Sequence, residues 1–279
     1  MRVFLTGATG YVGAAVAAAL HDRGHEITAL VRPESEARDL RERGAVIVAG
    51  DMRSLPDLSD ALKGQDAYVH AASGRNRDAV TDDKTAVDVL SRAGYFVFTS
   101  GVWILGAGKS DEGSKLNPIS LVAWRAAHEQ MALATGKSAV LRPGCVYGGK
   151  QSLLAGWFAA AEQRKPLQIT GDGNNCWAMV NLHDLIDCYM RIIEQRATGI
   201  FHGVDDTHAT LNDCARSVAP SGKIEHVAGE GPFGEALALD QTVSSEATRR
   251  KLGWTPRRTF TTSIEEQWRE WRDALQPTT

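Results

Sequence analysis

Short apolar runs alternate with helical patterns along the first half of the chain. The runs that predict strands cover residues 3–6, 27–31, 45–49, 67–71, 95–99 and 139–142. Apolar residues recur at helical spacing over 11–23, 85–92 and 120–135, and a segment rich in Arg and Glu after the second run predicts a short helix. Because the runs are apolar on both faces, they are typical of buried parallel strands. The pattern predicts an α/β fold with a Rossmann-type, doubly wound parallel sheet.

The pattern becomes less regular after about residue 150. It predicts helices over 157–162, 183–194 and 263–274, strands over 178–180 and 200–204, and a hairpin-type turn at Asp172-Gly173. We find no internal repeat and no low-complexity segment. We therefore expect a core domain over residues 1–150 and a smaller C-terminal lobe over residues 151–279, which partly returns to the core sheet.

Composition and charge exclude several classes of protein. The 279 residues carry 31 Lys and Arg against 34 Asp and Glu, a formal net charge of −3, and 43% of them are hydrophobic. These values are average for a globular protein and argue against disordered, collagen-like and disulfide-rich chains. The slight excess of negative charge argues against a nucleic-acid interface. No apolar run reaches the ~20 residues that a membrane-spanning helix needs, so we expect no membrane partner.

The cysteines and the first twenty residues bear on the compartment. The four cysteines lack any Cys-x-x-Cys pair, and their scatter is typical of reduced thiols in a cytoplasmic protein: Cys145, Cys176, Cys188 and Cys214. The apolar N-terminal stretch is interrupted by three glycines and ends in a charged segment, so we do not interpret it as a secretory signal. His and Cys lack the spacing of metal ligands, so no metal site is expected.

The strongest chemical signal follows the first predicted strand and opens the first predicted helix. It reads Gly7-Ala8-Thr9-Gly10-Tyr11-Val12-Gly13. The chain must turn sharply here, and glycine allows both the turn and the close approach of a pyrophosphate to the backbone. The N–H groups at the helix N-terminus are suited to bind the phosphates. In its βαβ context the loop predicts a dinucleotide site; a tight turn without ligand is the alternative.

Further segments follow the ends of the other predicted strands. They are Gly50-Asp51, Val69-His70-Ala71-Ala72, Phe98-Thr99-Ser100-Gly101 and Arg142-Pro143-Gly144-Cys145-Val146-Tyr147-Gly148, followed later by Val180-Asn181-Leu182-His183-Asp184-Leu185 and Arg249-Arg250-Lys251-Leu252-Gly253-Trp254-Thr255-Pro256. With the glycine loop, they resemble the extended and atypical short-chain dehydrogenase/reductase superfamily, the relatives of NAD-dependent epimerases and dehydratases. The resemblance covers nearly the whole chain and does not specify a substrate.

The resemblance implies where a bound dinucleotide would lie. Asp51 and Met52 would lie at the adenine, and Ala71, Ala72 and Ser73 along the ribose and phosphates. The expected cofactor site is completed by other residues of the same segments and by the residue at the family's lysine position: Gly7, Thr9, Gly10, Tyr11, Val12, Thr99, Pro143, Gly144 and His128.

Arg32 bears on which dinucleotide binds. NAD-preferring members carry an acidic residue after the second strand, which binds the ribose diol. Here Val31-Arg32-Pro33 offers no carboxylate, and the guanidinium of Arg32 could pair with a 2′-phosphate, with Arg38 as a weaker candidate. The alternative is a solvated surface arginine. The sequence favours NADP(H) over NAD(H).

The catalytic positions depart from the family pattern. Active members usually carry a Ser or Thr after the fifth strand and Tyr-x-x-x-Lys on the next helix, where the lysine ammonium lowers the pKa of the tyrosine. Laid on this chain, the hydroxyl position is Gly101, beside Ser100, the tyrosine position is Trp124 and the lysine position is His128. An indole N–H donates a hydrogen bond but is no acid near neutral pH. The usual dyad is therefore absent.

Other groups could take over part of this chemistry. The candidates are Ser100, Trp124, the imidazole of His128, and Tyr147, which lies in a segment that the family places near the nicotinamide. Each has a structural alternative: His128 packed toward the sheet, and Tyr147 in the core with a satisfied hydroxyl. Trp103, Trp124, Trp157 and Trp177 form a substrate pocket or act as packing anchors.

Three functions remain open from the sequence. The first is an NADP(H)-dependent oxidoreductase that acts on a small organic carbonyl or an activated alkene, since hydride transfer is the chemistry of the cofactor. The second is a non-catalytic dinucleotide-sensing regulator like the NmrA-type relatives, suggested by the loss of all three catalytic positions. The third is a nucleotide-sugar epimerase or dehydratase, which needs the missing tyrosine. Related proteins often form homodimers through helices beside the sheet, although this sequence does not require one.

Overall fold

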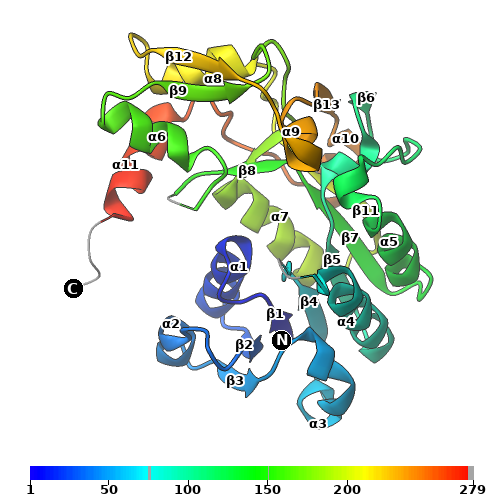
Figure 1. The fold of residues 1–279 in the computed structure, drawn as a ribbon. Coiled ribbons are helices and arrows are strands. Elements are labelled where there is room, and N and C mark those ends of the chain that lie inside the picture. Colours follow the sequence, from blue (N-terminus) through cyan, green and yellow to red (C-terminus); the bar gives the residue numbers. More distant parts are fainter. Residues whose placement is uncertain (75–76, 150, 276–279) are drawn as a thin grey trace. The chain divides into compact units, whose positions relative to one another are not determined.

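The computed structural model describes residues 1–74, 77–149 and 151–275 and contains a seven-stranded sheet (Figure 1). The strands lie in the order β11-β7-β5-β4-β1-β2-β3. Their bounds are β1 (Arg2–Thr6), β2 (Glu26–Val31), β3 (Val46–Ala49), β4 (Ala67–His70), β5 (Phe96–Thr99), β7 (Ser138–Pro143) and β11 (Gly199–Gly203). The β1–β2, β1–β4, β2–β3, β4–β5 and β5–β7 pairs are parallel. The predicted doubly wound α/β sheet is confirmed.

Helices cover the sheet because each presents one apolar stripe to it. The helix α1 (Tyr11–Asp22) packs on β1 and β2, whereas α4 (Ala79–Ala93) and α5 (Arg125–Leu133) contact each other and β5. Residues of these two helices and of the strands share one core, which includes Phe4, Tyr68, Val87, Leu90, Phe96, Phe98, Ala132 and Val140. The predicted helix over 120–135 is divided: a 3₁₀ turn covers Ser120–Val122 before α5 begins.

Shorter elements connect the first strands. They are α2 (Arg38–Glu42), the 3₁₀ helix η1 (Met52–Asp57) and α3 (Ser59–Leu62). The helix α2 packs against β3, and η1 packs against α4. The helix α2 belongs to the connection between β2 and β3, and η1 and α3 belong to the connection between β3 and β4.

The chain forms two compact units, each built from three segments. Unit 1 comprises residues 1–100, 124–142 and 186–201, and unit 2 comprises residues 101–123, 143–185 and 202–279. We expect a single boundary near residue 150, which would divide the chain into two continuous parts. In the structure, each compact unit instead takes its three segments alternately along the chain. Residues after 150 contribute β11 to the central sheet.

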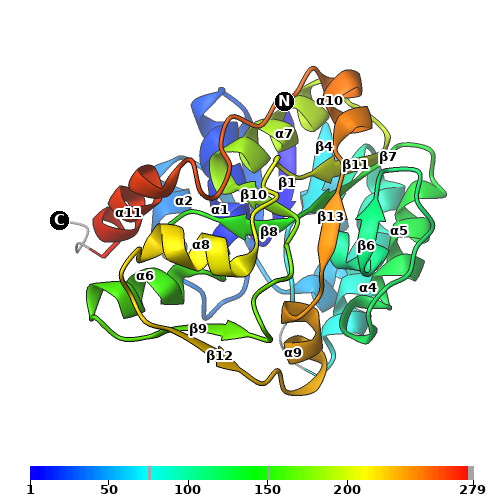
Figure 2. The same cartoon turned by 90° about the horizontal axis from the view of Figure 1, so that it is seen from above.

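Unit 2 has its own apolar core. Its elements include α6 (Ala155–Glu162), β9 (Leu167–Thr170), α8 (Leu211–Val218), β12 (Ile224–Val227) and α11 (Ile264–Asp273). Figure 2 shows β9 and β12 side by side, next to α6 and α8. Their shared core contains Trp157, Phe158, Trp177, Phe260 and Trp271.

The remaining elements of the described residues are four short strands and four helices. Two further strand pairs join β6 (Gly108–Ser110) to β13 (Gln241–Val243) and β8 (Cys145–Tyr147) to β10 (Met179–Asn181). The remaining helices are η2 (Val102–Leu105), α7 (Leu182–Glu194), α9 (Gly231–Leu237) and α10 (Glu246–Leu252). No helix in the described residues is both long and apolar enough to span a membrane.

The hairpin-type turn predicted at Asp172-Gly173 is wrong. The preceding strand, β9, pairs in parallel with the distant β12 and not with the next strand. Asp172 instead accepts a hydrogen bond from the backbone N–H of Asn174 at 2.9 Å, and the backbone of Gly173 is left-handed with φ +72°. An Asx-type bend uses the same residues as a hairpin turn, so the dipeptide alone does not separate the two.

Candidate functional site

The glycine loop joins β1 to α1. At two of its glycines, Gly7 and Gly13, there is no room for a side chain. Gly7 has φ +81°, and a Cβ at this position would lie 2.5 Å from the backbone nitrogen of Ala72. A Cβ on Gly13 would overlap the carbonyl oxygen of Gly7. Gly10 is the N-cap of α1 and offers no side chain to cap it, so the helix N-terminus is suited to bind an anionic ligand.

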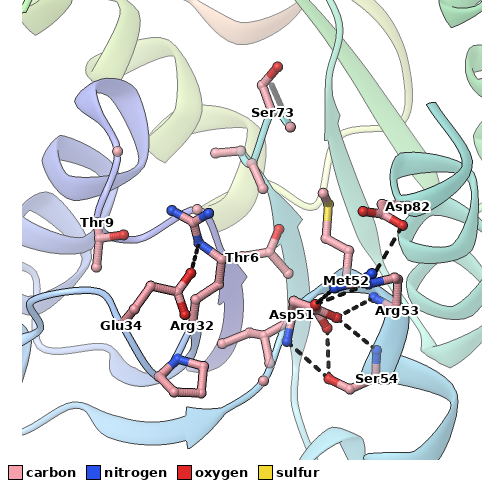
Figure 3. A pocket seen from close by; sticks show the side chains of 18 residues that line it. Thr6, Thr9, Arg32, Glu34, Asp51, Met52, Arg53, Ser54, Ser73 and Asp82 are labelled. Atoms are coloured by element: carbon pink, nitrogen blue, oxygen red, sulfur yellow. Dashed lines mark hydrogen bonds and ion pairs between the residues drawn. The ribbon is translucent and has the colours of Figure 1, made fainter. Parts of the chain in front are cut away.

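A cavity of about 1020 Å³ lies at this loop (Figure 3). Its walls come from the carboxyl ends of β1 and β2 and from the loops that follow β3 and β4, with Asp82 from α4. β1 lies between β2 and β4, where the strand order reverses. Doubly wound sheets bind their ligands at this switch point. The volume is at the upper end of the range for small-molecule sites, as an extended dinucleotide requires.

Most of the predicted cofactor residues in unit 1 line this cavity. They are Gly7, Thr9, Gly10, Arg32, Asp51, Met52, Ala71, Ala72 and Ser73. Tyr11, Val12, Thr99 and His128 are not among the residues that line it, and Pro143 and Gly144 belong to unit 2. Their contact with a cofactor stays a prediction.

The residues that follow β2 contribute one positive and one negative side chain to the cavity, Arg32 and Glu34. The Nε atom of Arg32 lies 3.4 Å from a carboxylate oxygen of Glu34, and about two thirds of each side chain is exposed (65% and 67%). Glu34 lines the cavity and was not predicted, although it follows Arg32 by only two residues. Arg38, the weaker candidate, does not line the cavity and pairs with Glu42 at 2.8 Å. Arg32 is therefore the arginine of the β2–β3 connection that the cavity can use.

A second charged group faces the cavity from the loop after β3. Asp51 caps η1 by accepting hydrogen bonds from the backbone of Arg53 and Ser54. The guanidinium of Arg53 donates to the Asp51 carboxylate at 2.6 Å and lies 3.9 Å from Asp82. The hydrogen bond from the Arg53 side chain lowers the pKa of Asp51 against the effect of burial. Arg53 and Asp82 were not predicted, and both line the cavity.

His128 lies in a buried polar network. Its Nδ1 is 2.7 Å from one carboxylate oxygen of Asp83, whose other oxygen is 3.1 Å from Nε2 of His70. The Nδ1 of His70 is in turn 2.6 Å from the hydroxyl of Thr6, which lines the cavity. Asp83 was not predicted. The signal was its place on the buried face of α4, three, four and seven residues before Ala86, Val87 and Leu90.

Trp124 packs against its neighbours on the same helix. Its ring lies 5.0 Å from that of His128, edge to face, and the guanidinium of Arg125 lies 4.4 Å from the indole centroid. Arg125 also donates to the backbone carbonyl of Thr99 at 3.0 Å, and the Thr99 hydroxyl is 2.6 Å from that of Tyr189. The groups around Trp124 are thus packed against one another.

Ser100 is buried at the end of β5. Its backbone N–H donates to Leu141 at 2.8 Å. Its hydroxyl has no hydrogen-bond partner among the described residues. A buried hydroxyl without a partner costs about 1–3 kcal/mol, which a ligand oxygen would recover.

Tyr147 is fully buried in unit 2, and its hydroxyl donates to Asp205 at 2.8 Å. This geometry agrees with the alternative of a core tyrosine with a satisfied hydroxyl. Burial raises the pKa of Asp205 to about 6, although hydrogen bonds from Thr207 and Tyr147 lower it. Trp157 and Trp177 lie in the core of unit 2 and donate to backbone carbonyls, so they are packing anchors.

Comparisons with known proteins agree with this geometry. A family model described as NAD(P)H-binding matches residues 7–141. The uncharacterised protein YLL056C of Saccharomyces cerevisiae is 30% identical over 283 residues, which cover 92% of this chain and 95% of that protein. The decarboxylating sterol-4-alpha-carboxylate 3-dehydrogenase of Dictyostelium discoideum is 28% identical over 182 residues, 55% of this chain and 56% of that enzyme. The structure of dTDP-glucose 4,6-dehydratase from Bacillus anthracis in complex with NAD superposes with a TM-score of 0.84 at 16% identity, covering 99% of this chain and 97% of that one.

Fold and cavity define a dinucleotide-binding α/β protein. Within this class, the chain belongs to one family with YLL056C, and it shares its fold with the NAD-dependent epimerases and dehydratases of the extended short-chain dehydrogenase/reductase family. It differs from the usual family pattern by Gly101, Trp124 and His128 at the three catalytic positions.

The glycine loop can be tested by comparing two left-handed glycines. We expect Gly7→Ala to weaken NAD(P)H binding by about 100-fold or more, because the methyl group pushes the loop away from the end of β4. Gly24 has φ +75° with open space around it, so Gly24→Ala should cost only ~1–2 kcal/mol of folding free energy and leave binding unchanged. Cofactor fluorescence titration and denaturant unfolding measure the two effects. Equal binding by both variants would contradict the close approach at Gly7.

The buried carboxyl of Asp205 should make stability fall as pH rises. Its pKa of about 6 in the folded protein exceeds the ordinary value of 3.8, so the folded state binds more protons between pH ~4 and 6. The free energy of unfolding therefore decreases across this window by roughly 3 kcal/mol from this group and is constant above it. Asp205→Asn should remove this contribution in denaturant titrations from pH 4 to 7. The adjacent, exposed Asp206 provides the control Asp206→Asn; a difference between wild type and Asp205→Asn that does not change with pH refutes the assignment.

Proposed function

We propose that the chain is an NADP(H)-dependent oxidoreductase that acts on a small organic carbonyl or an activated alkene. The observation that carries this proposal is the hydroxyl of Ser100, which is buried without a partner among the described residues. It follows β5, the neighbour of β4, whose loop lines the cofactor cavity. A donor in this position suits an oxygen that gains negative charge during reduction.

Each group in the site has a defined part in this proposal. The nicotinamide, when bound, supplies or accepts the hydride. Ser100 donates a hydrogen bond to the substrate oxygen, and His128 takes the place of the family lysine beside the ribose. The indole N–H of Trp124 is a further donor but transfers no proton.

The preference for NADP(H) rests on Arg32. Its planar guanidinium suits a phosphate, and its present partner Glu34 holds it only through an exposed ion pair at 3.4 Å. Exposed pairs of this kind contribute about 0–1 kcal/mol, so a 2′-phosphate competes with Glu34 at little cost.

The second candidate is a dinucleotide sensor without catalysis. It is supported by the packing of Trp124 under Arg125 at the position where the family carries its proton donor. The nucleotide-sugar epimerase or dehydratase alternative has only the shared fold in its favour, since that chemistry needs the tyrosine.

Replacement of Arg32 tests the cofactor preference. We expect wild type to bind NADPH more tightly than NADH, and Arg32→Ala to weaken NADPH binding about tenfold or more while NADH binding changes little. Glu34→Gln should strengthen NADPH binding, because it removes the competing carboxylate. Arg38→Ala is the matched control, since Arg38 lies outside the cavity lining. The preference is wrong if Arg32→Ala changes the affinities for both cofactors equally.

Turnover tests the reaction. NADPH oxidation is followed with a panel of small aldehydes, ketones and activated alkenes, and at least one should be reduced. Ser100→Ala should then lower kcat by roughly 100-fold, because one donor to the developing charge is lost, without changing NADPH affinity. Ser110 also has a buried hydroxyl with no partner among the described residues, so Ser110→Ala is the control. Saturable NADPH binding without turnover of any panel member would favour the sensor.

A further inference from the structure

A buried carboxylate lies between two imidazoles in unit 1. Asp83 on α4, His70 at the end of β4 and His128 on α5 have side chains that are at most 5% exposed. The parallel register pairs Thr6 of β1 with His70 of β4, which explains the contact between these two side chains. The network therefore joins four elements of the sheet and its helices, and at Thr6 it reaches the cofactor cavity.

The hydrogen bonds determine which nitrogen of each ring carries a proton. Burial raises the pKa of Asp83, but hydrogen bonds from His128 and His70 outweigh it and lower the pKa below its ordinary range. An ionised carboxylate only accepts hydrogen bonds, so each ring nitrogen that faces it must donate. These are Nδ1 of His128 and Nε2 of His70. In its neutral form His70 then accepts the hydroxyl proton of Thr6 at Nδ1.

This arrangement leaves one nitrogen of His128 available. Among the described residues, Nδ1 is bound to Asp83, so Nε2 is the atom that can meet a ligand. The neighbouring cation, Arg125, donates to the backbone carbonyl of Thr99. A neutral Nε2 accepts a hydrogen bond, whereas the lysine that the family has at this position only donates.

We propose that Asp83 is a positioning residue that fixes His128 as the Nδ1–H tautomer, so that Nε2 accepts a hydrogen bond from a ribose hydroxyl of the bound dinucleotide. The proposal rests on the proposed function for the presence of the dinucleotide. The position of the proton on His128 does not depend on it.

The tautomer can be measured on the wild-type protein. Long-range ¹H–¹⁵N spectra of ¹⁵N-histidine-labelled protein, with His128→Gln to assign the ring, should show a protonated Nδ1 and an unprotonated Nε2. NADP⁺ should shift the Nε2 resonance, whereas adenosine 2′,5′-bisphosphate, which lacks the nicotinamide ribose, should leave it in place. A proton on Nε2 in the free protein overturns the proposal, and so does an Nε2 resonance that does not move at saturating NADP⁺.

Replacement of the carboxylate provides the second measurement. Asp83→Asn places an amide N–H beside one of the two rings, so we expect a mixture of tautomers at His128 and about tenfold weaker NADP⁺ binding. Asp88→Asn changes a carboxylate on the same helix that pairs with Arg92, and it should leave both unchanged. An unaltered His128 spectrum in Asp83→Asn contradicts the positioning role. If wild type binds no NADP⁺, the proposed function fails, while the spectrum of the free protein still tests the role of Asp83.

Discussion

The site depends on the close approach of two backbones, the β1–α1 turn and the end of β4. Gly7 lies so near Ala71 and Ala72 that even a methyl group has no room, and its left-handed φ suits only glycine. The same parallel pairing of β1 with β4 brings Thr6 beside His70. One strand pair thus positions both the N-terminus of α1 and the buried polar network of Thr6, His70 and Asp83.

Two arginines that line the cavity, Arg32 and Arg53, form ion pairs that a charged ligand can replace. Arg32 and Arg53 are both more than half exposed, and each already pairs with a carboxylate that lines the same cavity. These pairs contribute little free energy in water, so an incoming phosphate can take over a guanidinium without a large cost. The buried pair of Arg142 and Glu129 is different, since both side chains are 2% exposed and a lost partner would leave an isolated charge in the core.

The sequence predicts the sheet and the glycine loop well because each has a local signature. Apolar runs of strand length mark the parallel strands, and Gly7, Gly10 and Gly13 mark the turn. It does not predict contacts that form between distant segments. Glu34 and Arg53 reach the cavity from loops, and their positions depend on where β2 and β3 end in three dimensions. The turn at Asp172 was misjudged because the partner of β9 lies more than fifty residues away.

Asp83 has a local signature in the sequence, but its contacts with distant segments could not be predicted. A carboxylate on the apolar face of α4 was visible in the sequence, but its partners come from β4 and α5, 13 and 45 residues distant. Burying an ionised carboxylate is costly unless hydrogen bonds satisfy it, and two imidazoles satisfy this one. His128 and Trp124 are therefore more than replacements of a lysine and a tyrosine. With Asp83 and Arg125 they form one packed set, in which Nδ1 of His128 is bound to Asp83 and Arg125 donates to Thr99. In the proposed tautomer, the ring nitrogen that remains is an acceptor where the family has a donor.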